Sequence, residues 1–365
     1  MGEVIGLPLA ERDWLIALDA VQGVGWKTIQ RLVEGTESLN ELAEWTVEKY
    51  VSIGIRSDVA LVLREKLTVD FINEVKQRRK RWPYCVITVF DEDYPRLLRE
   101  IHQPPWVLYG LGDVRLLQSP SIGMVGTRKP TSYGRMAAFR LARELTEYGF
   151  TVISGMARGI DTEAHKGALQ AGGGTIAVLG CGIDVVYPPE NKKLYETIAE
   201  KGLVLSEYPP GTPVHAGLFP QRNRIISGLA YGVVVVEAPI RSGALITADF
   251  ALEQSRDVFA VPGPIYQIQS SGTNRLIRDG AKIVTDVEDI LAEYPEHARA
   301  NSQKTVDLPP EEAKVLSHIG YAGIHIDELK KLTGLEWKAL YPVLMQLQLK
   351  KMIRQLPGAY FIRCE

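Results

Sequence analysis

Small residues and arginines follow several apolar runs of the chain, at points where β-strands are expected to end. The first two of these segments are Gly126-Thr127-Arg128 and Ser154-Gly155-Met156-Ala157-Arg158-Gly159. Glycine lets backbone amides approach an anion closely, and a guanidinium can bind a phosphate through two parallel hydrogen bonds. Both segments are therefore predicted to bind phosphate groups.

A third group of candidate phosphate-binding and aromatic contact residues lies between residues 219 and 243. It comprises Phe219, Arg222, Asn223, Arg224, Ser242 and Gly243. The stretch Phe219–Asn223 (FPQRN) is interpreted as a turn. The rings of Phe219 and Tyr208 could stack on bases, a contact worth about 1–3 kcal/mol per base in single-strand binders. Several arginines in succession suit a phosphodiester backbone.

Several polar residues in and near these loops also have a structural interpretation. The alternatives are internal ion pairs for Arg128 and Arg158, loop bracing for Asn191 and Asn223, bracing or helix capping for Asp161 and Glu207, and a core or capping position for His165. For Asp161, Glu207 and His165 the structural role is the expectation, and for Arg128 and Arg158 it is phosphate binding.

The elements that position these loops alternate regularly from residue 119 onward. The expected strands are Ile122–Val125, Thr151–Ser154, Thr175–Leu179, Leu203–Ser206, Val233–Val236, Val258–Val261 and Lys282–Val284. Helical patterns lie between most of them, which predicts an α/β, Rossmann-like, doubly wound parallel sheet. Ligands of such sheets bind outside the carboxyl ends of the strands, where the small-residue loops occur.

Two smaller domains are expected to flank the sheet. Residues 1–83 show short helical patterns of a SAM or helix-hairpin-helix type, followed by the sheet domain at 84–293 and a linker at 294–308. The turn Val21–Gly25 could face glycine amides toward a phosphate, or could simply join two packed helices. Three helical patterns and a hairpin at 309–365 predict a winged helix.

Composition narrows the function classes. A net charge of −2 argues against a protein that coats duplex DNA with a large basic face. No apolar run reaches the roughly 18 residues of a membrane helix, and no signal peptide is evident. Three distant cysteines fit a reducing compartment. We therefore expect a cytoplasmic protein without membrane segments, metal or cofactor.

Common enzyme motifs are missing from the sequence. No dinucleotide fingerprint, Walker lysine loop or nucleophile elbow is present. Gly180-Cys181-Gly182, for example, has Val185 where a third glycine would stand. No catalytic residue is therefore assigned, and the protein is not expected to be an enzyme.

Nine motifs in order resemble those of the DprA/Smf family of DNA-processing proteins. They are VGTRKPTSYG, SGMARGIDTEAH, GCGIDVVYPPEN, SEYPPG, FPQRNRIISGL, VVVVEA, SGALITA, VFAVPG and GTNRLI, within residues 85–290. The resemblance implies a bacterial protein that binds single-stranded DNA without sequence preference and forms a homodimer through the Rossmann-like domain. It also implies protection of incoming DNA during natural transformation and help in loading the RecA recombinase.

The family's binding residues carry over by motif. Arg128 matches the first-loop arginine, Arg158 the second-loop basic position, and Arg222, Asn223 and Arg224 the RNR signature. Thr127 stands where the family often has serine, and Ser255 stands where glycine is usual. No motif marks the dimer or RecA surfaces.

Two other functions remain open at this level. One is a Rossmann-like nucleoside monophosphate phosphoribohydrolase with Glu237 or Glu253 as an acid, although Glu237-Ala238-Pro239 stands where its glycine-rich signature is expected. The other is a regulator that reads duplex DNA through the winged helix, whose third helix carries Trp337 and Lys338.

Overall fold

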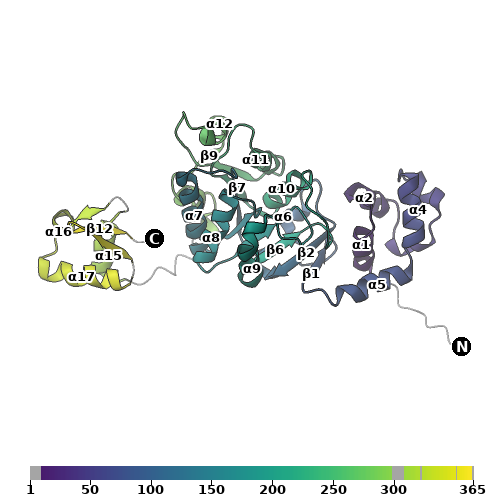
Figure 1. Cartoon of the computed structure of the whole chain (residues 1–365), viewed down its shortest axis with the longest axis horizontal. Helices are drawn as coiled ribbons and strands as arrows, with labels where there is room; N and C mark the ends of the chain where they lie inside the picture. The colour runs from purple at the N-terminus through teal and green to yellow at the C-terminus, as the bar shows by residue number, and fades with distance from the viewer. Residues whose placement is uncertain (1–9, 298–307, 321–322, 351, 364–365) are drawn as a thin grey trace. The chain divides into compact units, whose positions relative to one another are not determined.

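The computed structural model describes residues 10–297, 308–320, 323–350 and 352–363. The chain divides into two compact units, Met1–Asn301 and Ser302–Glu365 (Figure 1). No helix of the described residues is long and apolar enough to cross a membrane.

The first unit begins with short helices. They are α1 (Glu11–Asp19), α2 (Trp26–Glu34), η1 (Leu39–Glu44), α3 (Val47–Ser52), α4 (Ser57–Lys66) and α5 (Val69–Arg79). Two basic residues near the end of α5 hold that helix against α1. Lys76 and Arg79 form ion pairs with the buried Asp13 at 2.8 and 3.3 Å.

These helices and part of the sheet share one hydrophobic core. It includes Trp14, Leu18 and Leu32 from the helices and Tyr109 and Val204 from the sheet. Such a continuous core fixes the helices against the sheet.

A nine-stranded sheet forms the centre of the first unit, in the order β1-β2-β6-β5-β4-β3-β7-β8-β9. Its strands are β1 (Cys85–Thr88), β2 (Val107–Gly112), β3 (Ser121–Val125), β4 (Thr151–Ser154), β5 (Thr175–Val178), β6 (Leu203–Ser206), β7 (Gly232–Val235), β8 (Asp257–Ala260) and β9 (Lys282–Ile283). β2 is antiparallel to both of its neighbours, β1 and β6, and all other pairs of adjacent strands are parallel. The predicted α/β class is confirmed, and β3 pairs with both β4 and β7, so the strand order reverses there.

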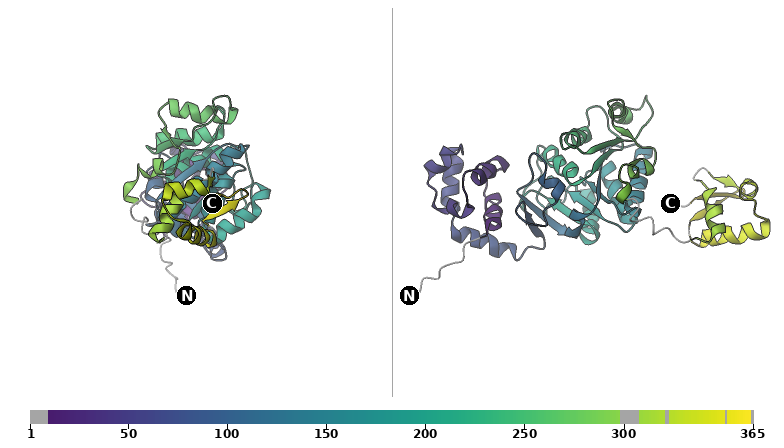
Figure 2. Two further views of the ribbon diagram at one scale, coloured as in Figure 1. Left: turned by 90° about the vertical axis from the view of Figure 1, so that its left-hand side faces the viewer. Right: turned by 180° about the vertical axis from the view of Figure 1, so that it is seen from behind.

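Helices cover both faces of the sheet (Figure 2). They are α6 (Arg96–Arg99), η2 (Val114–Gln118), α7 (Ser132–Glu147), α8 (Ile160–Gln170), η3 (Pro189–Asn191), α9 (Lys192–Lys201), α10 (Leu218–Leu229), α11 (Gly243–Glu253), η4 (Ile268–Ser270), α12 (Ser271–Arg278) and α13 (Glu288–Leu291). Helices α7 and α8 pack with Ile122 and Val234 on one face, and α10 and α11 pack with Val125 and Val233 on the other.

The turn predicted at Phe219–Asn223 is wrong. These residues form the first turns of α10. Pro220 is the third residue of that helix, where its missing N–H would have had no intrahelical partner, so proline does not interrupt the helix. The helical frame separates side chains that a turn would have kept together.

The second unit has the predicted winged-helix elements. They are α15 (Pro310–Ser317), β10 (Ile324–His325), α16 (Ile326–Thr333), α17 (Trp337–Leu349), β11 (Ile353–Leu356) and β12 (Tyr360–Arg363). The hairpin of β11 and β12 is joined by β10, a strand that the sequence did not reveal, in the order β10-β12-β11. The core contains Leu329, Leu340, Leu347 and Phe361.

Candidate nucleic-acid interface

An open groove with a volume of about 790 Å³ lies at the carboxyl ends of β3 and β7, where the strand order reverses. Most of the residues predicted to bind DNA line it: Gly126, Thr127, Arg128, Phe219, Arg222, Asn223, Ser242 and Gly243. Gly155 and Arg158 line a smaller hollow next to it, which Arg128 and Phe219 share. The structure thus brings together residues that are far apart in the chain.

Three predicted residues lie outside both hollows. Ser154 is fully buried, and its Oγ donates a hydrogen bond to the carbonyl of Met124 at 2.6 Å. Gly159 is buried, and a Cβ there would overlap the carbonyl oxygen of Thr127. Arg224 lines a different cavity, described below.

The loop after β3 is held by one buried carboxylate, that of Glu237. Its two oxygens accept hydrogen bonds from Thr131, one from the Oγ1 at 2.6 Å and one from the amide at 2.9 Å. Its carbonyl accepts from the amide of Thr127 at 2.7 Å. A Cβ at Gly126 would lie 2.5 Å from Cγ1 of Ile160, so only glycine fits at this turn.

Arg222 ties the loops together from below the groove. Its side chain is buried, and Nη1 donates to the carbonyls of Val178 and of Gly155, the latter at 2.8 Å. A Cβ at Gly155 would overlap Nη2 of Arg222. Burial lowers the pKa of Arg222 and raises that of Asp161, while each charge favours the other.

Unlike Arg222, three other basic side chains of the groove are exposed. Arg128, Lys129 and Arg241 are exposed and line the groove, and within the described ranges none has a carboxylate partner. Arg158, in contrast, pairs with Glu190. That pair is exposed on both sides, so its contribution to stability is small and the arginine can exchange partners.

Two aromatic rings lie next to each other beside Arg128. The rings of Phe219 and Tyr187 are 5.4 Å apart, and the guanidinium of Arg128 lies over Phe219 at 5.6 Å. Tyr208, the other ring expected to stack on bases, does not reach the groove, because its hydroxyl contacts the carbonyl of Leu218 from the opposite side of α10.

Several structural alternatives are also seen. Asn191 donates to the carbonyl of Met156 at 2.9 Å and braces the loop after β4. Asn223 accepts from Nε of Arg222 and donates to the carbonyl of Gly243, both at 3.3 Å. His165 is fully buried, as expected, with Nδ1 2.8 Å from Oγ1 of Thr175.

Four further residues line the groove that were not predicted from the sequence: Lys129, Tyr187, Arg241 and Gln269. Lys129 and Arg241 had a detectable signal, because each adjoins a predicted residue, Arg128 or Ser242. Nothing in the sequence pointed to Gln269. No cluster of histidine, cysteine and carboxylate side chains that could hold a metal occurs in the part of the chain that is described.

Two family models match the chain. DNA recombination-mediator protein A matches residues 85–295, and the DprA winged helix domain matches residues 299–359. Among curated proteins, the chain is 34% identical to the Smf protein of Synechocystis over 97% of this chain and 99% of that protein. It is 47% identical to the DNA processing protein DprA of Streptococcus pneumoniae over 57% of this chain and 73% of that protein.

Two solved structures of DprA proteins are also similar to the chain. The crystal structure of DprA from Streptococcus pneumoniae has a TM-score of 0.68 and 37% identity, covering 79% of this chain and 99% of that one. A DprA structure from Helicobacter pylori, described as showing its single-stranded DNA binding mode, has a TM-score of 0.54 and 31% identity, covering 60% of this chain and 98% of that one. The chain therefore belongs to the DprA/Smf family of DNA processing proteins.

Proposed function

We propose that the protein binds single-stranded DNA without sequence preference in the groove at the carboxyl ends of β3 and β7. The observation that carries this proposal is that three cations without a carboxylate partner among the described residues, Arg128, Lys129 and Arg241, line one groove with Phe219, and that the guanidinium of Arg128 lies over the ring. Cations without carboxylate partners can take up phosphates, and the half-buried ring of Phe219 offers a stacking surface that does not distinguish between bases, so the site needs no particular sequence.

Two of the RNR residues act differently from the simple expectation. The donors of Arg222 already serve the carbonyls of Gly155 and Val178, and Arg224 turns away from the groove. In this proposal Arg222 positions the phosphate-binding loops, and Arg128, Lys129 and Arg241 contact the phosphates. The relative from Helicobacter pylori, whose description reports a single-stranded DNA binding mode, supports this ligand.

We also propose that the protein catalyses no reaction on the DNA. Glu237, one of the two carboxylates considered as the acid of a phosphoribohydrolase, is only 2% exposed and is held by Thr131 on both oxygens. Such a carboxylate serves as a brace rather than as a proton donor to a ligand. Release of base from a nucleoside monophosphate, abolished in Glu237→Gln, would contradict this part of the proposal.

The membership of the family suggests the biological setting. We propose a homodimer, formed through the Rossmann-like domain, that protects incoming DNA and helps load RecA during natural transformation. Sedimentation at several concentrations tests the dimer. The rate at which RecA assembles on DNA coated with single-strand-binding protein, with and without this chain, tests loading, and an unchanged rate would contradict it.

The decisive measurement is fluorescence anisotropy of labelled oligo-dT titrated with protein at several salt concentrations. Arg128→Ala should weaken binding and reduce the slope of log affinity against log salt by about 0.7, the amount expected for one phosphate contact on a single strand. Arg96→Ala removes an exposed arginine that lies outside the groove, and it should behave like the wild type. An unchanged slope in Arg128→Ala would contradict the proposed contact.

A duplex of equal length separates this proposal from duplex reading by the winged helix. Removal of residues 302–365, the second compact unit, should leave oligo-dT binding within about twofold, because the groove lies entirely in the first unit. Loss of binding in the truncated chain, or preference of the full chain for duplex, would favour the regulator instead.

A further inference from the structure

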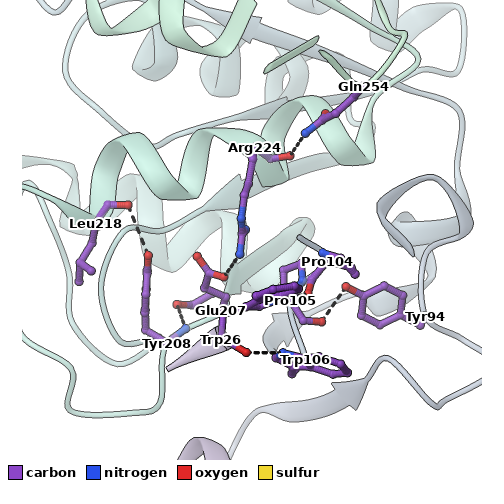
Figure 3. Close-up of polar contacts among 11 residues, drawn as sticks. Trp26, Tyr94, Pro104, Pro105, Trp106, Glu207, Tyr208, Leu218, Arg224 and Gln254 are labelled. Carbon is purple, nitrogen blue, oxygen red and sulfur yellow. Dashed lines mark hydrogen bonds and ion pairs between the residues drawn. The ribbon is translucent and has the colours of Figure 1, made fainter. Parts of the chain in front are cut away.

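A second cavity, with a volume of about 670 Å³, lies between the N-terminal helices and the sheet domain within the first unit. The turn between α1 and α2 forms one wall, and the segment 103–107, the loop after β6 and α10 form the others. Figure 3 shows the part of this cavity around Trp26, Glu207 and Arg224. We call it the hairpin cavity.

The α1–α2 turn is fixed in place by two tryptophans. Nε1 of Trp26 donates to the carbonyl of Pro104 at 2.6 Å, and Nε1 of Trp106 donates to the carbonyl of Trp26 at 3.1 Å. The two rings lie 5.7 Å apart. This wall of the cavity is therefore preorganised against the sheet domain.

The start of α2 presents backbone amides to the cavity. Its N-cap is Gly25, which offers no side-chain cap, and a Cβ at Gly25 would meet nothing within 4 Å. Gly23 has a φ of 88°, a conformation that suits glycine. The uncapped amides and the helix dipole favour an anion here.

Arg224 supplies an independent indication that the cavity suits an anion. Its side chain is only 10% exposed, and one terminal nitrogen, Nη2, lies 2.5 Å from Oε2 of Glu207. The other terminal nitrogen, Nη1, is buried and has no hydrogen-bond partner among the described residues. In Figure 3 the guanidinium points from α10 toward the Glu207 and Trp26 side of the cavity. A buried donor without an acceptor is costly, and a ligand oxygen would remove that cost.

More basic than acidic side chains line the cavity. Lys27 is exposed at its mouth, where the described residues offer it no carboxylate, and Arg31 and Arg56 also line the wall. Arg31 donates to the carbonyl of Gly54, and Arg56 pairs with Asp58.

Two acidic side chains, Asp19 and Glu207, oppose these cations. Arg224 offsets Glu207. Burial raises the pKa of Asp19 to about 7, so its negative charge is partial near neutral pH. The cavity therefore remains favourable for an anion.

Helix α10 separates the hairpin cavity from the DNA-binding groove. Gln221 and Arg224 line the cavity, whereas Phe219, Arg222 and Asn223 line the groove. A helix with its side chains is about 10–12 Å wide, a distance that a few nucleotides of a single strand can span. One strand can therefore reach both hollows.

We propose that the hairpin cavity binds a phosphodiester of the same single strand after it has crossed α10. This inference rests on the proposed function of the groove. Lys27 and the amides at the start of α2 would bind the phosphate oxygens, and the guanidinium of Arg224, which lines the cavity, would turn its buried, unpartnered Nη1 toward them. The site explains why an uncapped glycine turn, an unpaired lysine and a buried arginine donor meet in one place.

Two lengths of oligo-dT separate the two sites. One of about 5 nucleotides fills the groove alone, and one of about 15 nucleotides can reach the hairpin cavity. Lys27→Ala should weaken binding of the longer strand and reduce its salt slope by about 0.7, with no effect on the shorter one. Gly25→Ala, which fits without a clash, should also weaken only the longer strand, because its methyl group stands in front of the amides.

Lys66→Ala, an exposed lysine of the same helical region outside the cavity, is the control. Equal behaviour of Lys27→Ala and Lys66→Ala on the longer strand would overturn the inference while leaving the groove intact. Equal loss on both lengths would also overturn it, because Lys27 would then act on the groove. Weakening of duplex binding alone would reassign the cavity to duplex DNA, and failure of the wild type to bind either strand would overturn both proposals.

Discussion

The guanidinium carbon of Arg128 lies 5.6 Å from the centre of the Phe219 ring, so the cation proposed to bind a phosphate adjoins the ring proposed to stack on a base. The pair joins the loop after β3 to the first turn of α10. In the proposed function, one nucleotide would place its phosphate on the arginine and its base on the ring.

Phe219→Ala should weaken oligo-dT binding by about 5- to 150-fold, because about 1–3 kcal/mol of stacking is lost. The salt slope should stay unchanged, since the removed contact carries no charge. Phe219→Trp keeps an aromatic face and should bind like the wild type. Anisotropy at three salt concentrations measures both quantities, and wild-type affinity in Phe219→Ala would exclude a stacking role.

Gly155→Ala should destabilise the protein by about 1–3 kcal/mol, because the added methyl group overlaps the guanidinium of buried Arg222. Gly243→Ala is the matched control: it is another glycine of the groove, at the first position of α11, and a Cβ there meets nothing within 4 Å. Denaturant unfolding of both variants makes the comparison. Equal stability of the two would contradict the close packing of Arg222 against Gly155.

His165→Gln should flatten the loss of stability on acidification. Burial lowers the pKa of His165 to about 3 from an unfolded value of 6.5, so the unfolded chain takes up a proton first. The free energy of unfolding therefore falls as the pH drops below about 6.5, by at most about 1.4 kcal/mol per pH unit, until the pH reaches about 3. Denaturant unfolding at several pH values checks this. His215→Gln, at an exposed position, should leave the slope unchanged.

Asp19→Asn should show the opposite pH dependence. Burial raises the pKa of Asp19 to about 7 against the pull of its hydrogen bond from Tyr109, so the folded chain binds this proton more tightly. The resulting stability is present at low pH and is lost progressively as the pH rises from the unfolded pKa of 3.8 through the folded value of about 7.

Near pH 8 the asparagine variant should therefore be more stable than the wild type, and the advantage should shrink toward about pH 5. Asp58→Asn, at an exposed carboxylate, is the control. A constant difference between Asp19→Asn and the wild type across this range would mean that Asp19 does not titrate there. Because Asp19 and His165 act in opposite directions over part of the range, only the variants separate them.

Much of the sheet was predictable because parallel strands buried on both faces leave long apolar runs. Val233–Val236, for example, differs from the observed β7 by one residue at each end. The same reasoning located the groove, since loops at the carboxyl ends of neighbouring parallel strands meet in space. The short strand β10 was missed because two residues carry too little periodicity.

The direction of individual side chains was less predictable. Arg222 and Arg224 belong to one sequence signature, but on α10 they point to different hollows, and the mistaken turn at Phe219–Asn223 hid that divergence. Burial of Arg222 depends on Gly155, which is 67 residues away in the chain. Such a contact has no local pattern to reveal it.

The space filled by the guanidinium of Arg222 is the space that a side chain at position 155 would need. The two sites should consequently evolve as a pair, with a larger residue at 155 tolerated only where the arginine has been replaced. The arginine itself is bonded to backbone carbonyls of residues 155 and 178, which every amino acid possesses. Its bonding therefore sets no requirement on the side chain at 178, whose identity is governed by core packing, while the pairing of 155 with 222 persists.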